Sequence, residues 1–271
     1  MAEKTKESPL RFMNLTEARE AGIEFDEPRE TRCEWCDAVL EPLGMIGLGG
    51  KFQWISSVEC TCEGAKKAKE REEARIKAEE EKRRIDTFLQ AGVKKRFLDA
   101  QITNPVASSY LNSFSEAPGV GLYIAGPSRA GKTYLASSLA KAFCLSGYRT
   151  ILTTSLSMLD AIKASFDGDI KSGTSRYASA DVLIIDDLGK ENANSWVMTT
   201  LFQIVNERYE AMRPTIVTSQ YMPEDLKRRM SRSGETESAT AIVERLKETC
   251  RLLCLPRRKN VHLMEDVPRD A

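Results

Sequence analysis

The sequence is poor in the features that would assign it at once to a membrane or secreted class. No apolar run approaches the roughly 20 residues that a membrane-spanning helix needs, and residues 1–7 are charged where a signal peptide has an apolar segment. Net charge is also lacking, because 40 basic residues balance 40 acidic ones. These absences predict a cytoplasmic protein with no membrane partner, whose contacts with nucleic acid come from local patches.

Histidine is almost absent, which limits the metal sites that the chain can build. The only histidine, His262, lies far from two close cysteine pairs that flank a glycine-rich, strand-like segment. A tetrahedral Zn²⁺ site needs four ligands, so the complete local set is Cys33, Cys36, Cys60 and Cys62. The alternative, four unliganded thiols, would leave this short segment with almost no core. We expect a structural zinc module here, and we expect the remaining thiols in the core: Cys144, Cys250 and Cys254.

Residues 126–133 carry the strongest motif of the chain. They fit G-x-x-x-x-G-K-[ST] at every fixed position, after an apolar run at residues 120–125 and before a helical pattern. Such a loop directs backbone N–H groups at phosphates, and the helix adds its positive end. The residues expected to bind ATP are Gly126, Pro127, Ser128, Arg129, Ala130, Gly131, Lys132 and Thr133. Lys132 is expected to reach the β- and γ-phosphates, and the Thr133 hydroxyl to bind Mg²⁺.

A second motif follows about 50 residues later. An apolar run that begins at residue 182 ends in Asp186 and Asp187, which is typical of a buried parallel strand with ligands at its carboxyl end. We expect Asp186 to hold Mg²⁺ and Asp187 to orient or deprotonate the attacking water. A strand ending in acids can occur by accident, but its place after a phosphate loop favours the catalytic interpretation.

The order of these features resembles one family. Residues 92–100, G-V-K-K-R-F-L-D-A, join the cysteine module and a charged helix to the phosphate loop. Over residues 33–255 this arrangement resembles the DnaC/DnaI helicase loaders and their relative IstB, which are AAA+ ATPases. The resemblance implies a three-layer α/β fold with a parallel sheet of the P-loop (AAA+/ASCE) type. It also implies a DnaB-type replicative helicase and single-stranded DNA as partners, with self-association at ATP interfaces.

Several further roles rest on the resemblance alone. Residues 218–220, T-S-Q, resemble the sensor 1 motif T-S-N, with Gln220 in place of asparagine. Arg245 resembles an arginine finger supplied to a neighbouring subunit, and the alternative is a helix-surface salt bridge with a nearby glutamate. Arg208 resembles a recurrent family arginine without an assigned role. Residues 256–260 offer no clean match to the sensor 2 motif, and the candidate substitutes there are Arg257 and Arg258.

Basic residues elsewhere allow two interpretations. Lys163 and Lys171 are candidate contacts to single-stranded DNA by resemblance, although lysines on a solvated face are common. Residues 227–234 are predicted as a basic loop, which is either a solvated surface or a phosphate contact. Acidic and basic residues interleave over residues 63–90, so we predict an exposed helical connector there. A further helix is predicted over residues 156–166 with Ser155 as its N-cap.

The sequence therefore predicts three parts: residues 1–62 with the zinc module, residues 63–91 as a helical linker, and residues 92–271 as an AAA+ ATPase domain without a helical lid. The expected function is loading of a replicative helicase by a slow, oligomer-dependent ATPase. The nearest alternative is an IstB-like ATPase that assists a transposase on duplex DNA. A metabolite kinase and a zinc-dependent adaptor with a degenerate nucleotide site are the alternatives from other classes.

Overall fold

The computed structural model describes residues 12–47, 50–165 and 170–257. Contacts divide the chain into two compact units, Met1–Lys82 and Arg83–Ala271. The boundary falls inside the long helix α2 (Glu63–Gln90), which is polar along most of its length as its interleaved charges predict. Among the described helices, none combines the length and the apolar character needed to cross a bilayer.

The first unit is built from two small antiparallel sheets. Its elements are β1 (Met13–Asn14), α1 (Leu15–Glu20), β2 (Thr31–Arg32), β3 (Val39–Leu40), β4 (Pro42–Ile46) and β5 (Phe52–Ser57), with strand orders β1-β4-β5 and β2-β3. Asn14 caps α1 by accepting the N–H of Glu17 at 2.9 Å, as the sequence allows for a short helix here. Phe25, Phe52 and Trp54 pack ring to ring, with the Phe52 and Trp54 centroids 4.9 Å apart. This small core is consistent with a module that needs a further crosslink.

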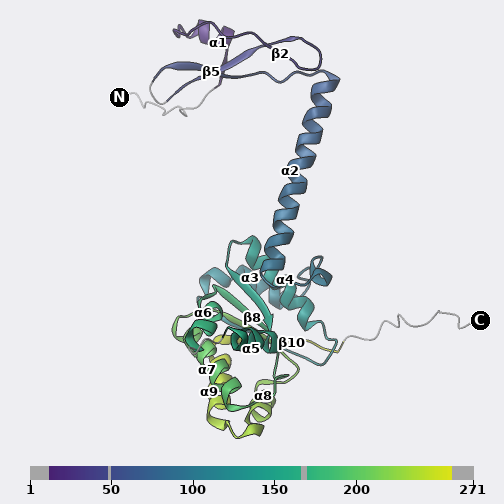
Figure 1. The fold of residues 1–271 in the computed structure, drawn as a ribbon, viewed down its shortest axis with the longest axis vertical. Helices are drawn as coiled ribbons and strands as arrows, with labels where there is room; N and C mark the ends of the chain where they lie inside the picture. The colour runs from purple at the N-terminus through teal and green to yellow at the C-terminus, as the bar shows by residue number, and fades with distance from the viewer. Residues whose placement is uncertain (1–11, 48–49, 166–169, 258–271) are drawn as a thin grey trace, which may run out of the picture. The chain divides into compact units, whose positions relative to one another are not determined.

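The second unit is a five-stranded parallel sheet with helices on both faces (Figure 1). Its strands are β6 (Gly121–Ala125), β7 (Thr150–Thr154), β8 (Val182–Leu188), β9 (Thr215–Ser219) and β10 (Cys250–Cys254). Its helices are α3 (Pro105–Asn112), α4 (Lys132–Leu145), α5 (Ser155–Ala164), α6 (Ile170–Ser179), α7 (Ser195–Glu210), α8 (Pro223–Met230) and α9 (Thr236–Thr249), with short 3₁₀ turns at Lys95–Phe97, Phe114–Glu116 and Ser231–Ser233. The strand order is β10-β6-β9-β8-β7. The predicted three-layer α/β fold is confirmed for this unit.

Alternation along the strands sends side chains into two separate cores. Leu122 and Ile124 of β6 face a core with α3, α4 and the end of α2, whereas Tyr123 and Ala125 face a core with α5, α7 and α9. This period of two is what a strand buried on both faces requires. The sheet order also puts β9 between β6 and β8, so the strand that follows α7 lies between the two motif-bearing strands.

The segment after α2 is fixed against the edge of the sheet. Gly92 adopts φ +97°, and a Cβ at this position would lie 1.9 Å from the carbonyl oxygen of Leu152 on β7. The N–H of Leu152 donates to the carbonyl of Ala91 at 2.6 Å. Glycine is therefore required at residue 92 by both the left-handed turn and the close approach of two backbones.

Arg208 is a structural residue at the centre of the second unit. Its side chain is 0% exposed and donates to five main-chain carbonyls, those of Tyr177, Ala178, Ala180, Asp181 and Pro214, and to the Thr215 hydroxyl. Three of these carbonyls lie at the end of α6, where a cation complements the negative end of the helix dipole. The structure thus gives a role in folding to an arginine that the sequence leaves unassigned.

Three local predictions are corrected. The N-cap of α5 is Thr154, whose hydroxyl accepts the N–H of Ser157 at 3.1 Å, whereas Ser155 is the first helical residue. Residues 227–230 belong to helix α8 and not to a basic loop, because Pro223 at the first helical position and two acidic residues favour a helix start. Cys254 is exposed on the edge strand β10 and is not a core thiol.

Candidate nucleotide-binding and cysteine sites

The phosphate-loop motif lies between the carboxyl end of β6 and the first turn of α4. The N–H of Gly126 donates to the carbonyl of Ser219 on β9 at 3.2 Å, which fixes the start of the loop. Arg129 and Gly131 both adopt left-handed backbone, with φ +65° and +95°, and Gly131 is the N-cap of α4. The first N–H groups of a helix have no intrahelical acceptor, so those of Lys132 and Thr133 remain available to an anion.

Lys132 folds back over the loop. Its ammonium donates to the carbonyls of Gly126 at 2.8 Å and Pro127 at 2.9 Å, and its side chain is almost entirely buried. Burial lowers the pKa of Lys132, while the neighbouring charges of Asp187 and Asp186 oppose that shift. The ammonium is thus held at the place where a phosphate chain cradled by the loop would need a positive charge.

Asp186 is a buried carboxylate held by two hydroxyl groups. Its Oδ2 accepts the Thr133 hydroxyl at 2.9 Å and its Oδ1 accepts the Thr218 hydroxyl at 2.6 Å, although the residue is only 4% exposed. Burial raises the pKa of Asp186, and these two hydroxyl donors act in the opposite direction. A buried carboxylate beside a threonine hydroxyl offers the hard oxygen ligands that Mg²⁺ prefers.

Asp187 begins a tight turn at the end of β8. Its φ is +61°, and the ladder between β8 and β9 shifts its register between Ile185 and Leu188. The bulge turns Asp187 out of the strand alternation, and its carboxylate accepts the ammonium of Lys190 at 2.8 Å. The two acids of the motif therefore lie in different environments, with Asp186 buried against β9 and Asp187 half-buried at the bulge of β8.

Residue 218, and not only residue 220, supplies the polar group at the end of β9. Gln220 is exposed just beyond the strand, whereas Thr218 is fully buried and contacts Asp186. The sequence singles out the T-S-Q motif but assigns its chemistry to Gln220. Strand alternation was the available signal, because Ile216 and Thr218 share the face of the sheet that carries Ile184 and Asp186 on β8.

Glu191 is a functional candidate that the sequence does not single out. It is 5% exposed, and its carboxylate accepts the Ser155 hydroxyl at 2.7 Å and the N–H of Gly189 at 3.0 and 3.1 Å. It thereby joins the loop after β8 to the start of α5. A charged residue in a polar stretch is usually exposed, which is why its sequence context gives no warning of its burial.

Arg245 lies on α9 against aromatic side chains. Its guanidinium stacks over the rings of Phe202 at 4.8 Å and Tyr209 at 5.5 Å, and its Nη1 donates to Ala241 O at 3.4 Å. Its Nε is buried without a hydrogen-bond partner among the described residues. The finger role and the surface salt bridge both remain predictions.

The candidate DNA-contacting residues differ in how free their side chains are. Lys163 on α5 and Arg232 in the 3₁₀ turn after α8 are exposed. Arg229 is engaged, because its Nε donates to the carbonyl of Gly189 at 2.5 Å and its guanidinium stacks on Tyr221. Arg257 is exposed at the end of the described residues, whereas the side chain of Lys171 and residues 258–260 of the possible sensor 2 segment lie outside the described part of the chain.

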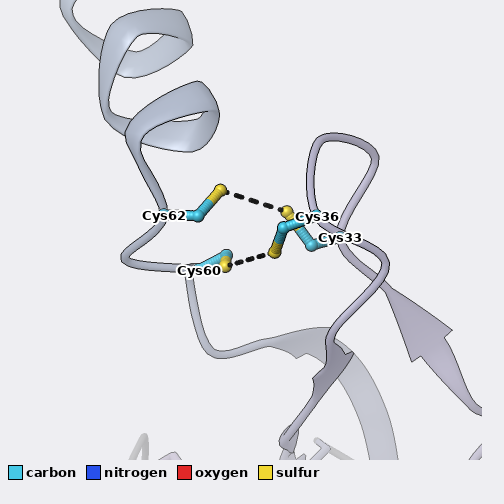
Figure 2. Close-up of side chains that lie close together, drawn as sticks. All are labelled: Cys33, Cys36, Cys60 and Cys62. Carbon is cyan, nitrogen blue, oxygen red and sulfur yellow. Dashed lines mark hydrogen bonds between the residues drawn. The ribbon is translucent and has the colours of Figure 1, made fainter.

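The four cysteines of the first unit converge on one point (Figure 2). Their sulfur atoms all lie within 4.8 Å of one another, with Cys33 to Cys62 at 3.7 Å and Cys36 to Cys60 at 3.5 Å. A tetrahedral ion with Zn–S bonds of about 2.3 Å holds its sulfurs about 3.8 Å apart. The sulfurs are too far apart for disulfides, and the geometry can hold a tetrahedral metal ion.

Hydrogen bonds around the cluster also suit a metal-bound thiolate. The N–H groups of Trp35 and Cys36 lower the pKa of Cys33. The N–H of Ala38 acts in the same direction on the pKa of Cys36, but the neighbouring sulfurs of Cys60 and Cys33 raise it. The N–H of Ala65, in the first turn of α2, donates to Cys62 at 3.4 Å. Such N–H donors to sulfur support deprotonated ligands and fix their orientation. The donor set fits zinc, a metal that thiolates select.

The sheet order, the loop and the paired aspartates define the second unit as a P-loop nucleotide-binding domain. The family model described as IstB-like ATP binding protein matches residues 87–257, more than half of the chain. The chain therefore belongs to the IstB-like ATP-binding family.

Curated relatives include helicase loaders and insertion-sequence proteins. The replicative helicase loader DnaI of Bacillus subtilis is 26% identical over 56% of this chain and 50% of its own length. The insertion sequence IS1162 putative ATP-binding protein of Pseudomonas fluorescens is 31% identical over 36% of this chain and 43% of its own. The replicative helicase loader DnaC of Escherichia coli K12 is 28% identical over 36% and 42%. The chain thus spans half or less of the length of these relatives.

Solved structures agree on the fold. The crystal structure of the DnaC helicase loader aligns with a TM-score of 0.52 and 23% identity, over 60% of this chain and 99% of that one. AMPPCP-bound DnaA from Aquifex aeolicus aligns with a TM-score of 0.50 and 21% identity, over 60% and 51%. The expected P-loop fold of the AAA+ type is thereby confirmed.

Proposed function

We propose that this protein is an ATP-dependent helicase loader that binds a DnaB-type replicative helicase and single-stranded DNA in the cytoplasm. One observation carries the proposal: Lys132 and Thr133 at the start of α4 lie with Asp186 of β8 at the carboxyl edge of the parallel sheet, in the arrangement that a magnesium-bound nucleotide needs. Loader relatives that match this chain, and a cysteine cluster in the preceding unit, support loading over other uses of ATP.

In this proposal the residues of the second unit divide the chemistry. Bound ATP supplies the γ-phosphoryl group, and its transfer to water converts the ATP-bound state into the ADP-bound state. The loop at residues 126–131 and the ammonium of Lys132 bind the phosphates, while Thr133 and Asp186 hold Mg²⁺. Asp187 orients the attacking water or accepts its proton, and the Gln220 amide hydrogen-bonds the water or the phosphate.

Hydrolysis depends on a neighbouring subunit. Arg245 extends its guanidinium toward the nucleotide of the adjoining protomer, where it stabilises the charge of the transition state. Its stacking on Phe202 and Tyr209 supports a preorganised cation. The isolated chain is therefore a slow ATPase.

The two ends of the chain take different partners. Residues 1–62, with zinc on Cys33, Cys36, Cys60 and Cys62, form the module that binds the helicase, and residues 63–91 are its helical linker. Residues 92–271 form the ATPase domain. Exposed Lys163 and Arg232 support phosphate contacts with single-stranded DNA along the same domain.

The test is co-purification of the full chain with a DnaB-type helicase from its host, with ATP or ADP present. The proposal predicts capture of the helicase in amounts that differ between the two nucleotides. Capture that is absent in both conditions contradicts the loader function but leaves nucleotide binding untouched.

A second candidate is an ATPase that assists a transposase on duplex DNA. Its support is the family model itself and the 31% identity with an insertion-sequence protein. Binding of labelled single-stranded and duplex DNA of equal length distinguishes the two functions. A preference for the single strand supports loading, and a preference for the duplex supports the transposition function.

A further inference from the structure

Lys190 is a second ammonium group near the phosphate loop, and neither motif includes it. It follows Asp187 by three residues, and its N–H donates to the carbonyl of Asp187 at 3.3 Å, which closes a turn. Its Nζ then reaches the Asp187 carboxylate at 2.8 Å. The pair is local, so its geometry depends on the turn and not on distant contacts.

The main chain on either side of Lys190 is firmly held. The N–H of Gly189 donates to the buried carboxylate of Glu191, and the carbonyl of Gly189 accepts Nε of Arg229 on α8. Glu191 is in turn fixed by the Ser155 hydroxyl. The lysine side chain, by contrast, is 44% exposed. The ammonium can therefore move on its flexible stem without any change in the loop.

The charge of Lys190 already acts on the nucleotide-binding residues. Burial lowers the pKa of Lys132, and the positive charge of Lys190 acts in the same direction. The same charge favours the ionised form of Asp186. Two ammonium groups and two carboxylates thus share one small region, with Lys132 held by carbonyls and Lys190 held by Asp187.

We propose that Lys190 binds the γ-phosphate of ATP, and that Lys190 forms its ion pair with Asp187 when no γ-phosphate is present. The inference rests on the proposed ATP binding. A terminal phosphate carries more negative charge than a single carboxylate, so it draws the ammonium away from Asp187. Asp187 is then free to act on water. ADP has no γ-phosphate, so the Lys190–Asp187 pair persists, and Lys190 distinguishes ATP from ADP.

The test compares equilibrium affinities for a non-hydrolysable ATP analogue and for ADP, both with Mg²⁺, by isothermal titration calorimetry of the full chain. Lys190→Ala is expected to lower the affinity for the ATP analogue about fivefold, which is the size typical of a partly exposed charge pair. The affinity for ADP is expected to stay unchanged. Lys190→Arg retains most of the analogue affinity. The matched control is Lys247→Ala on α9, an equally exposed lysine paired with Glu224 and Glu244, which changes neither affinity.

Two results overturn the inference. If Lys190→Ala lowers the affinities for the ATP analogue and for ADP equally, the effect is a general one of charge. If neither affinity changes, Lys190 makes no phosphate contact. In both cases the native chain still binds nucleotide, so the proposed function stands. Failure of the native chain to bind either nucleotide overturns the proposed function together with the inference.

Discussion

The hydroxyl of Thr218 donates a 2.6 Å hydrogen bond to the carboxylate of Asp186. The same hydroxyl oxygen accepts the N–H of Asp187 at 3.0 Å. One fully buried side chain on β9 therefore orients both acids at the end of β8. Sheet order makes this possible, because β9 lies between the strand that precedes the phosphate loop and the strand that carries the acids.

Replacing Thr218 with valine tests this link. The shape is kept, but the Asp187 N–H and one oxygen of Asp186 lose a buried partner, so we expect a loss of about 1–3 kcal/mol in the free energy of unfolding. Affinity for Mg²⁺-ATP should fall as well, because Asp186 is no longer held. Urea unfolding and calorimetry measure the two effects, and Thr218→Ser, which keeps the hydroxyl, should retain most of both. Native-like stability and affinity in Thr218→Val would contradict the assigned role.

Glu191 offers an independent test of the loop after β8. Glu191→Ala leaves the buried Gly189 N–H without its acceptor and leaves the Ser155 hydroxyl only the longer contact with the Asp187 carbonyl at 3.3 Å, which should cost about 1–3 kcal/mol of unfolding free energy. Glu191→Gln keeps an acceptor oxygen and should lose clearly less. The measurement is urea unfolding of the three chains, and equal stability of alanine and glutamine variants would exclude the hydrogen-bonding role.

Tyr123 gives a prediction in pH. Its hydroxyl donates to the carbonyl of Tyr221 at 2.8 Å, and burial raises the pKa of Tyr123 to about 12 from an ordinary 10.0. A raised folded-state pKa means that the stabilisation is complete below pH 10.0 and is lost as the pH rises toward 12. The free energy of unfolding of the native chain should therefore exceed that of Tyr123→Phe by about 1 kcal/mol at about pH 8. This difference in stability should be smaller at about pH 11. A difference that stays constant or grows with pH would be the wrong sign. The other tyrosines are present in both proteins, so their titration cancels in the difference in stability.

The cysteine cluster predicts one zinc ion per chain by elemental analysis. Removal of the ion should unfold the small first unit, because metal binding supplies the folding free energy that its few apolar contacts lack. Nucleotide binding by the second unit should survive chelation. Cobalt substitution provides a spectroscopic check through thiolate-to-metal absorption, which Cys36→Ser should alter. A zinc content near zero in protein purified without chelators would contradict the assignment of a zinc module.

Fixed spacing made the phosphate loop, the acidic strand and the cysteine pairs predictable. Local patterns also gave the buried parallel strand that ends in the paired aspartates, because such a strand leaves a strong apolar run. These features depend on residues that are close in sequence.

The remaining features depend on contacts between distant residues. Thr218 meets Asp186 only because β9 inserts between β6 and β8, and Glu191 is buried only because α5 begins beside it. Arg208 binds carbonyls from two segments around residues 177–181 and 214. No local pattern shows these contacts. The N-cap of α5 shows a smaller limit, since Thr154 and Ser155 are equally suitable by residue type.

The most direct test of the account is the affinity of Lys132→Ala for Mg²⁺-ATP, measured by isothermal titration calorimetry beside the native chain and the Lys247→Ala control. The buried ammonium is the phosphate-binding charge of the loop, so the account predicts a loss of at least about 100-fold, equivalent to about 2.7 kcal/mol, while circular dichroism shows an unchanged fold. An affinity for Mg²⁺-ATP equal to that of the native chain would contradict the claim that this loop binds the nucleotide.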